Sequence, residues 1–107
     1  MIQLVLRQLL PACHPLLVPR DGAWWRVSRQ YLEFFPRCVV CGKRKGVVPH
    51  HIKPVHKFPE LELMLGNLMT LCPRDHLLFG HLGSWSSWNE EVLLDCANMR
   101  LRIEKRP

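Results

Sequence analysis

The 107-residue sequence has no internal repeat and no low-complexity segment, and its ordinary aliphatic and aromatic content excludes a disordered tail. Acidic residues are scarce: 9 Asp and Glu stand against 15 Lys and Arg, which gives a net charge of +6. This imbalance favours a polyanionic partner, nucleic acid before a membrane, because phosphates attract cations whatever the base sequence. A chain of this length can form one domain with a small core.

A long unbroken apolar run is also missing. Residues 1–18, MIQLVLRQLLPACHPLLV, are mostly apolar, but they lack a basic start and are interrupted by Arg7, Gln8, Pro11 and His14. These breaks exclude a membrane-spanning helix and argue against an export signal, so we expect a cytoplasmic protein with no membrane partner. We expect residues 1–18 to form an N-terminal arm and residues 19–107 to form the folded domain.

The cysteine count is odd, which argues against a closed set of disulfides. Cys38 and Cys41 form a Cys-x2-Cys pair, and Cys72 precedes a histidine by a few residues. This grouping suits a thiolate metal site in a reducing compartment. Cys13 and Cys96 stand apart and are expected to be ordinary thiols.

Apolar residues recur at helical spacing between residues 24 and 35, and Pro36 is expected to end that helix. Its first two residues are Trp24 and Trp25. We expect both tryptophans to pack in the core rather than to stack on nucleotides.

The rest of the chain predicts a knuckle, a hairpin and two further helices. β-branched residues favour the strands, prolines limit the first of them, and Pro73 suits the first turn of a helix. The last helix has an acidic start and a basic end, which matches the helix dipole. The predicted elements are a zinc knuckle at 37–46, strands at 47–55 and 68–72, and helices at 73–82 and 90–106. Together they predict a small α+β domain centred on a two-stranded hairpin and a helix.

Candidate metal ligands gather in the middle third of the chain. In the predicted fold the two strands bring their ends side by side, and the helix that follows packs across them. Cys72 can then join the knuckle thiols around one ion, while a histidine on the helix faces a histidine on the first strand. One fold thus supports a structural metal site and a separate site for chemistry.

Three stretches in this order, PHHIKP, GNLMTLC and CPRDHLLFGH, resemble the ββα-metal motif of the HNH endonuclease family, and more narrowly a small bacterial and phage-like branch of it. The resemblance runs from about Trp24 to Ala97, with none for residues 1–18. It implies a metal-dependent endonuclease that hydrolyses phosphodiester bonds in DNA.

The resemblance also implies roles for individual residues. His51 matches the general base, for which an imidazole is suited by its pKa near neutrality. His50 and His76 match the ligands of one divalent catalytic ion (Mg, Mn, Ni or Zn), with His81 as a further candidate ligand. Asn67 matches the residue that fixes the loop so that the base points correctly.

The sequence departs from the family at the expected fourth thiolate, because Cys72-Pro-Arg is followed by Asp75. Asp75 could complete a structural zinc site with Cys38, Cys41 and Cys72. Alternatively, His76 joins the thiolates and His81 holds the catalytic ion. In a third alternative, the structural site binds zinc weakly or not at all.

Basic residues flank both motifs and are candidates for holding the DNA backbone. They are Arg37, Lys43, Arg44, Lys45, Lys53 and Lys57. No helix rich in base-reading side chains is evident, so binding should be electrostatic and should weaken as salt rises. The alternative function is a non-catalytic zinc module that binds nucleic acid; a toxin-like or phage-packaging role would share the nuclease chemistry.

Overall fold

The computed structural model describes residues 20–106; the N-terminal arm expected at residues 1–18 lies outside the described residues. Its helices and strands form the small α+β architecture that the sequence predicts. They are α2 (Trp24–Phe34), β1 (Val48–His51), η2 (Pro59–Leu61), η3 (Leu65–Asn67), β2 (Leu68–Leu71), α3 (Pro73–Asp75), η4 (His76–Gly80) and α4 (Val92–Glu104). None of the helices in this described part is long and apolar enough to cross a membrane.

The two strands pair antiparallel, with His50 opposite Met69 and His51 opposite Leu68. The prediction of a strand as long as 47–55 is wrong, because β1 ends at His51. One further hydrogen bond, from Ile52 N to Asn67 O (2.8 Å), continues the pairing before the chain turns away. The strand does not continue because both backbone groups of Lys53 bond to the side chain of Asn67, and the next residue, Pro54, has no N–H to donate.

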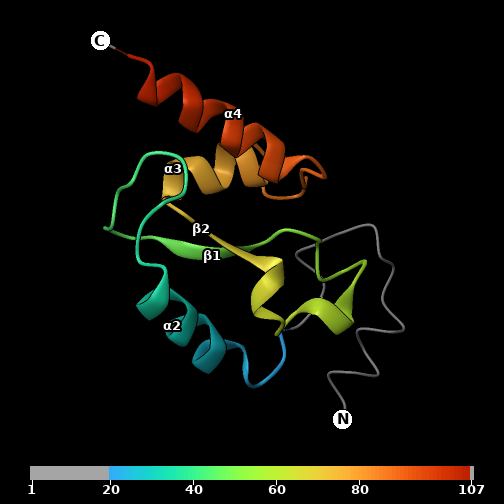
Figure 1. Cartoon of the computed structure of the whole chain (residues 1–107). Coiled ribbons are helices and arrows are strands. Elements are labelled where there is room, and N and C mark those ends of the chain that lie inside the picture. The colour runs from blue at the N-terminus through green and yellow to red at the C-terminus, as the bar shows by residue number, and fades with distance from the viewer. Residues whose placement is uncertain (1–19, 107) are drawn as a thin grey trace.

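Helices cover both faces of the hairpin: α2 lies on one face, and α3, η4 and α4 lie on the other (Figure 1). Successive side chains of β2 point to opposite faces of the hairpin, and they therefore pack into two different hydrophobic clusters. Met69 and Leu71 pack with buried residues of the knuckle and α4, whereas Leu68 packs with Trp24 and Tyr31. The Tyr31 hydroxyl donates to Leu68 O at 2.9 Å, which ties α2 to the strand.

Helix α2 occurs where the sequence predicts it, and it ends one residue earlier, at Phe34. The prediction that both tryptophans pack in the core is wrong for Trp25, which is 73% exposed while Trp24 is 7% exposed. Consecutive residues of an α-helix point about 100° apart, so only Trp24 shares the buried face with Ser28 and Tyr31.

The helix expected at 73–82 is present but irregular. After the single turn of α3, the backbone continues as a π-helix, and His81 N donates to His76 O at 3.1 Å. The last helix, expected at 90–106, spans Val92–Glu104 and packs on this irregular element through its buried Val92 and Cys96.

Candidate metal centres and the pocket beside them

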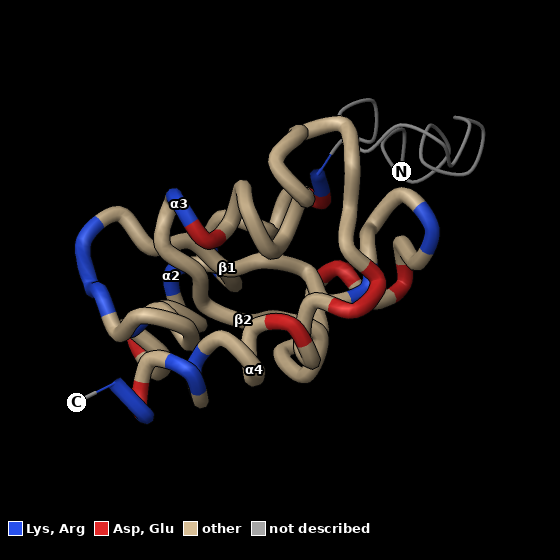
Figure 2. Tube along the Cα trace, turned by 90° about the horizontal axis from the view of Figure 1, so that it is seen from above, with Lys and Arg blue, Asp and Glu red and all other residues tan. Residues whose placement is uncertain are grey.

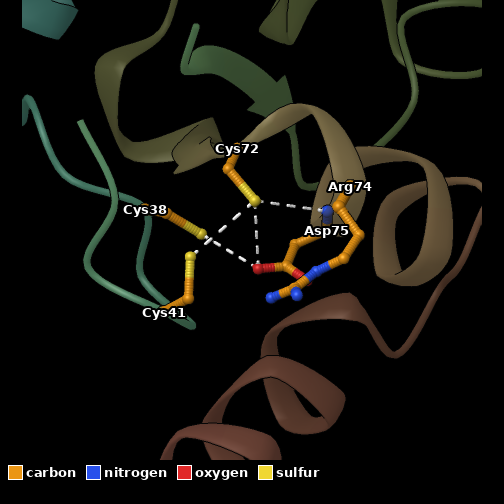
Figure 3. A network of polar contacts seen from close by, with 5 residues as sticks. All are labelled: Cys38, Cys41, Cys72, Arg74 and Asp75. Atoms are coloured by element: carbon orange, nitrogen blue, oxygen red, sulfur yellow. Dashed lines mark hydrogen bonds and ion pairs between the residues drawn. The ribbon is translucent and has the colours of Figure 1, made fainter. Parts of the chain in front are cut away.

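Four potential ligands converge between the knuckle and the start of α3 (Figure 3). The Sγ atoms of Cys38 and Cys72 lie 3.3 and 3.2 Å from Asp75 Oδ2, and Cys41 Sγ lies 3.8 Å from Cys72 Sγ. Cys38, Cys72 and Asp75 are at most 2% exposed. The ligand atoms lie within 4.8 Å of one another.

These separations fit a tetrahedral zinc site. With Zn–S near 2.3 Å and Zn–O near 2.1 Å, ligand atoms of a tetrahedron are separated by about 3.6 to 3.8 Å. The Cys41–Cys72 separation of 3.8 Å agrees with this value, and the sulfur–oxygen separations are a few tenths of an ångström shorter. Asp75 therefore stands where the missing fourth thiolate would be, so that this cluster can hold a metal through three sulfurs and one carboxylate.

The electrostatics of the cluster keep Asp75 ionised. Burial acts to raise the pKa of this carboxyl, but hydrogen bonds from the two thiols and from Arg74 outweigh it and hold the pKa below its usual value. Burial raises the pKa of Cys72 to about 12. In the absence of a metal the thiols are therefore donors to the carboxylate, and metal binding requires their deprotonation.

The local sequence explains why the knuckle closes. Cys38 N donates to Lys43 O and Gly42 N donates to Cys38 O, each at 2.9 Å, so the chain folds back within five residues. Gly42 has a φ of +79°, a conformation that glycine adopts without steric cost. The two thiols three residues apart are thereby directed to the same side.

Replacing Asp75 tests its place in this cluster. Asp75→Ala should weaken metal binding there by more than about tenfold, because even outer-shell partners of metal ligands contribute 10- to 100-fold. Asp75→Cys should restore it. Cobalt titration, followed by the thiolate-to-cobalt charge-transfer absorption, reports this site alone. Glu104→Ala is the matched control, since this exposed carboxylate pairs only with Arg100 among the described contacts; an unchanged titration in Asp75→Ala would exclude the carboxylate as a ligand.

A second potential metal cluster consists of His50, His76 and His81. Nε2 of His76 and Nε2 of His81 are 3.2 Å apart, close to the separation of about 3.3 Å for two imidazoles on one tetrahedral zinc. The ring of His50 lies edge-on to both, at centroid distances of 5.0 and 5.2 Å. His76 thus lies with the histidines and not with the thiols.

The imidazoles of His50 and His76 are held in the neutral state that a metal ligand requires. Burial, reinforced by the like charges of His76 and His81, lowers the pKa of His50 to about 2. Burial likewise lowers the pKa of His76 to about 4. At neutral pH, His50 and His76 therefore each present a lone pair.

The π-helical turn brings His81, the second histidine of this helix, into the cluster. In a regular α-helix, residues five apart point about 140° away from each other. In the π-helix η4, by contrast, the backbone hydrogen bonds join residues that are five apart. The side chains of His76 and His81 therefore lie one above the other and face the same ion position. The turn also places Gly80 directly beneath His50.

The chain after η4 orients His81 in a way that sequence reasoning missed. His81 Nδ1 contacts Ser87 O at 2.7 Å, and because a carbonyl only accepts, Nδ1 carries the proton and Nε2 carries the lone pair. Asn89 fixes the same loop by donating to Phe79 O at 2.9 Å and to Asp95 at 2.8 Å. Partners of this kind are typical of metal-binding histidines.

Gly80 offers a sharp test of the histidine cluster. A Cβ at this position would lie 2.9 Å from His50 Cε1, and the buried ring has little room to move. Gly80→Ala should therefore abolish metal binding at the histidines and preserve it at the thiolates. Calorimetric zinc titration should show two classes of site in the wild type and one in the variant. Gly22→Ala is the control because no atom lies within 4 Å of its added Cβ; two intact classes in Gly80→Ala would contradict this geometry.

His51 and the histidine cluster line the same pocket, whose volume is about 350 Å³. The rings of His50 and His51 leave β1 on opposite sides, and His51 packs on Trp24 at a centroid distance of 4.6 Å. His51 Nε2 contacts Glu62 O at 2.9 Å, so in the neutral ring Nε2 carries the proton and Nδ1 is basic.

Asn67 braces the segment that follows β1. Its Oδ1 accepts from Lys53 N at 2.8 Å, and its Nδ2 donates to Lys53 O and Leu61 O. The side chain is buried, so these bonds are shielded from water. Asn67 thereby links the end of β1 to the stretch that carries the carbonyl partner of His51.

The candidate phosphate-binding cations divide into two groups. Residues 43–45 follow Cys41 at one end of the hairpin, where Arg37 also donates to Gly42 O, whereas residues 53–57 lie at its other end (Figures 1 and 2). Pro54, Val55 and His56 line the pocket. Within the second group, Lys57 Nζ pairs with Glu90 at 3.4 Å and lies 4.8 Å from the ring centre of Trp88. Arg20, which the sequence did not single out, also lines the pocket.

Fold and site together define a small α+β domain with two clusters fit to bind metal ions, one rich in thiols and one of histidines. Residues 38–81 match the family model described as HNH endonuclease. This segment carries all seven residues of the two clusters. No curated protein and no solved structure matches the chain.

Proposed function

We propose that the protein is a metal-dependent endonuclease that hydrolyses phosphodiester bonds in DNA. The observation that supports this most is the convergence, in one open pocket, of a histidine with a basic nitrogen and a three-histidine cluster. A module that only bound nucleic acid would have no use for a base beside a metal cluster. The match of residues 38–81 to the nuclease family supports the same conclusion.

In this proposal His50, His76 and His81 hold one divalent ion, which leaves positions for phosphate and water. Such an ion would polarise the scissile phosphate and stabilise charge on the leaving oxygen. Cys38, Cys41, Cys72 and Asp75 hold a structural zinc that fixes the start of α3.

The proposed general base is His51, which takes the proton of the attacking water at Nδ1. Its contact with Glu62 O fixes the ring and supports the imidazolium that forms, because the proton on Nε2 already points at a carbonyl. Asn67 is a positioning residue, since it fixes the backbone around that carbonyl without facing the pocket itself.

Nicking of supercoiled plasmid tests this function. The wild type, stripped of metal and then supplied with Mg, Mn, Ni or Zn, should nick DNA only when metal is added. His51→Ala should be slower by about 10²- to 10⁴-fold, which is the range for loss of a general base, and should still bind metal. If the wild type is inert with every metal and yet retards DNA on a gel, the protein is a zinc-containing binding module and the nuclease proposal fails.

The salt dependence of DNA binding tests the three cations that follow Cys41. Neutralising Lys43, Arg44 and Lys45 to Gln should reduce the slope of log affinity against log salt by about 0.9 for each charge that contacts a phosphate. Lys105→Gln, at the exposed end of α4, should leave the slope unchanged. An unchanged slope in the triple variant would mean that these cations are a solvated surface.

A further inference from the structure

The sequence contains four tryptophans, and all of them line the pocket that holds the histidine cluster. Trp24 and Trp25 come from the first turn of α2, and Trp85 and Trp88 come from the loop after η4. These segments lie some 60 residues apart in the chain. Their aromatic side chains therefore converge from two directions on one site.

Two of the four rings remain open to solvent. Trp25 is 73% exposed and Trp85 is 46% exposed. Trp85 nevertheless lies against the metal cluster, with ring centroids 5.1 Å from His76 and 5.0 Å from His81. Exposed aromatic surface of this extent, beside a candidate catalytic site, indicates a surface that binds a ligand.

Positive charges lie over the other two rings. The guanidinium of Arg20 is 5.8 Å from the ring centre of Trp24, and the ammonium of Lys57 is 4.8 Å from that of Trp88. Aromatic faces interleaved with cations match the two parts of a nucleotide, a flat base and a charged phosphate.

The loop that carries Trp85 and Trp88 is fixed before any ligand binds. His81 Nδ1 lies within hydrogen-bond distance of Ser87 O. Ser84 N donates to His81 O at 3.0 Å, and Asn89 N donates to Gly80 O at 3.1 Å. The ring of Trp88 packs edge-on against His56 at 4.5 Å. Because the loop is already ordered, its tryptophans can bind a planar group without an entropic cost for ordering.

We propose that this tryptophan-lined pocket binds an unpaired nucleobase next to the phosphate that is cleaved, so that the preferred substrate is single-stranded or locally unpaired DNA. The proposal rests on the proposed nuclease function for the position of the phosphate. A paired base offers only its edges in the grooves, and its faces are covered by its neighbours. A pocket of about 350 Å³ is at the small end of the range for ligand sites and admits a base rather than a duplex.

Trp85 provides the main surface on which the base stacks. Its ring is half exposed and touches two of the proposed metal ligands, so a base on its face would lie beside the ion position. Trp25, which comes from α2 and lines the same pocket, is the second surface. Stacking on an aromatic face tolerates any base, which agrees with the absence of a base-reading helix.

Binding of fluorescein-labelled oligonucleotides, measured by anisotropy in a His51→Ala background that leaves the DNA intact, tests this proposal. Trp85→Leu should weaken binding of a 12-nucleotide single strand by about 5- to 150-fold, the usual contribution of one stacked base. Trp85→Phe, which keeps an aromatic face, should recover most of the loss. Binding of a 12-base-pair duplex should change less than twofold in both variants.

Two controls separate stacking from a general loss of structure. Leu101→Ala removes another half-exposed apolar side chain, on α4, and should leave single-strand affinity unchanged. Single strands in which abasic sites replace all the bases should bind more weakly to the parent protein and should be insensitive to Trp85→Leu. Equal losses for single strand and duplex, or no loss for either, would overturn the proposal.

Failure of this inference is distinguishable from failure of the nuclease function. If the wild type nicks plasmid with added metal but Trp85→Leu binds single strands normally, only the stacking site is excluded. If no metal supports nicking and Trp85→Leu still loses single-strand binding selectively, the pocket binds bases and the protein is not a nuclease.

Discussion

The pairing of β1 with β2 is the constraint on which both metal clusters depend. It places the knuckle beside the start of α3 and sets His50 opposite Met69, where its ring faces η4. Because side chains alternate along a strand, a register shifted by one residue would exchange the environments of His50 and His51. The proposed metal ligand His50 would then face α2, and the proposed base His51 would face the histidines of η4. Helices on both faces, and the different clusters they form with Leu68 and Met69, fix the register.

The two clusters are also joined through consecutive residues. Asp75 completes the thiol cluster and His76, the next residue, belongs to the histidine cluster. Consecutive residues in a helical turn point about 100° apart, so one turn can serve two ions on different sides. A metal bound by the thiols and Asp75 would therefore fix the position of the backbone that carries His76. In a domain with so small a core, this covalent adjacency would provide the rigidity that the proposed role of His76 as a catalytic metal ligand needs.

Much of this architecture could be predicted from the sequence, since it follows from local rules. The Cys-x2-Cys spacing predicted the knuckle, β-branched residues predicted the strands, and Pro73 predicted the start of the helix. The choice between Asp75 and His76 for the thiol cluster could not be made in the same way. It depends on the angle at which the helix approaches the knuckle, and that angle is set by tertiary packing of α4 and the hairpin.

Other features had no signal in the sequence. Nothing in the segment from Leu77 to Phe79 distinguishes a π-helical turn from an α-helical one, although that turn brings His81 into the cluster. The partner of His81 is the backbone carbonyl of Ser87, and every residue has a carbonyl. Trp25 was misjudged because apolar character alone does not specify which face of a helix a residue occupies. Its exposure, and the convergence of all four tryptophans, only become visible when residues far apart in the chain are brought together by the fold.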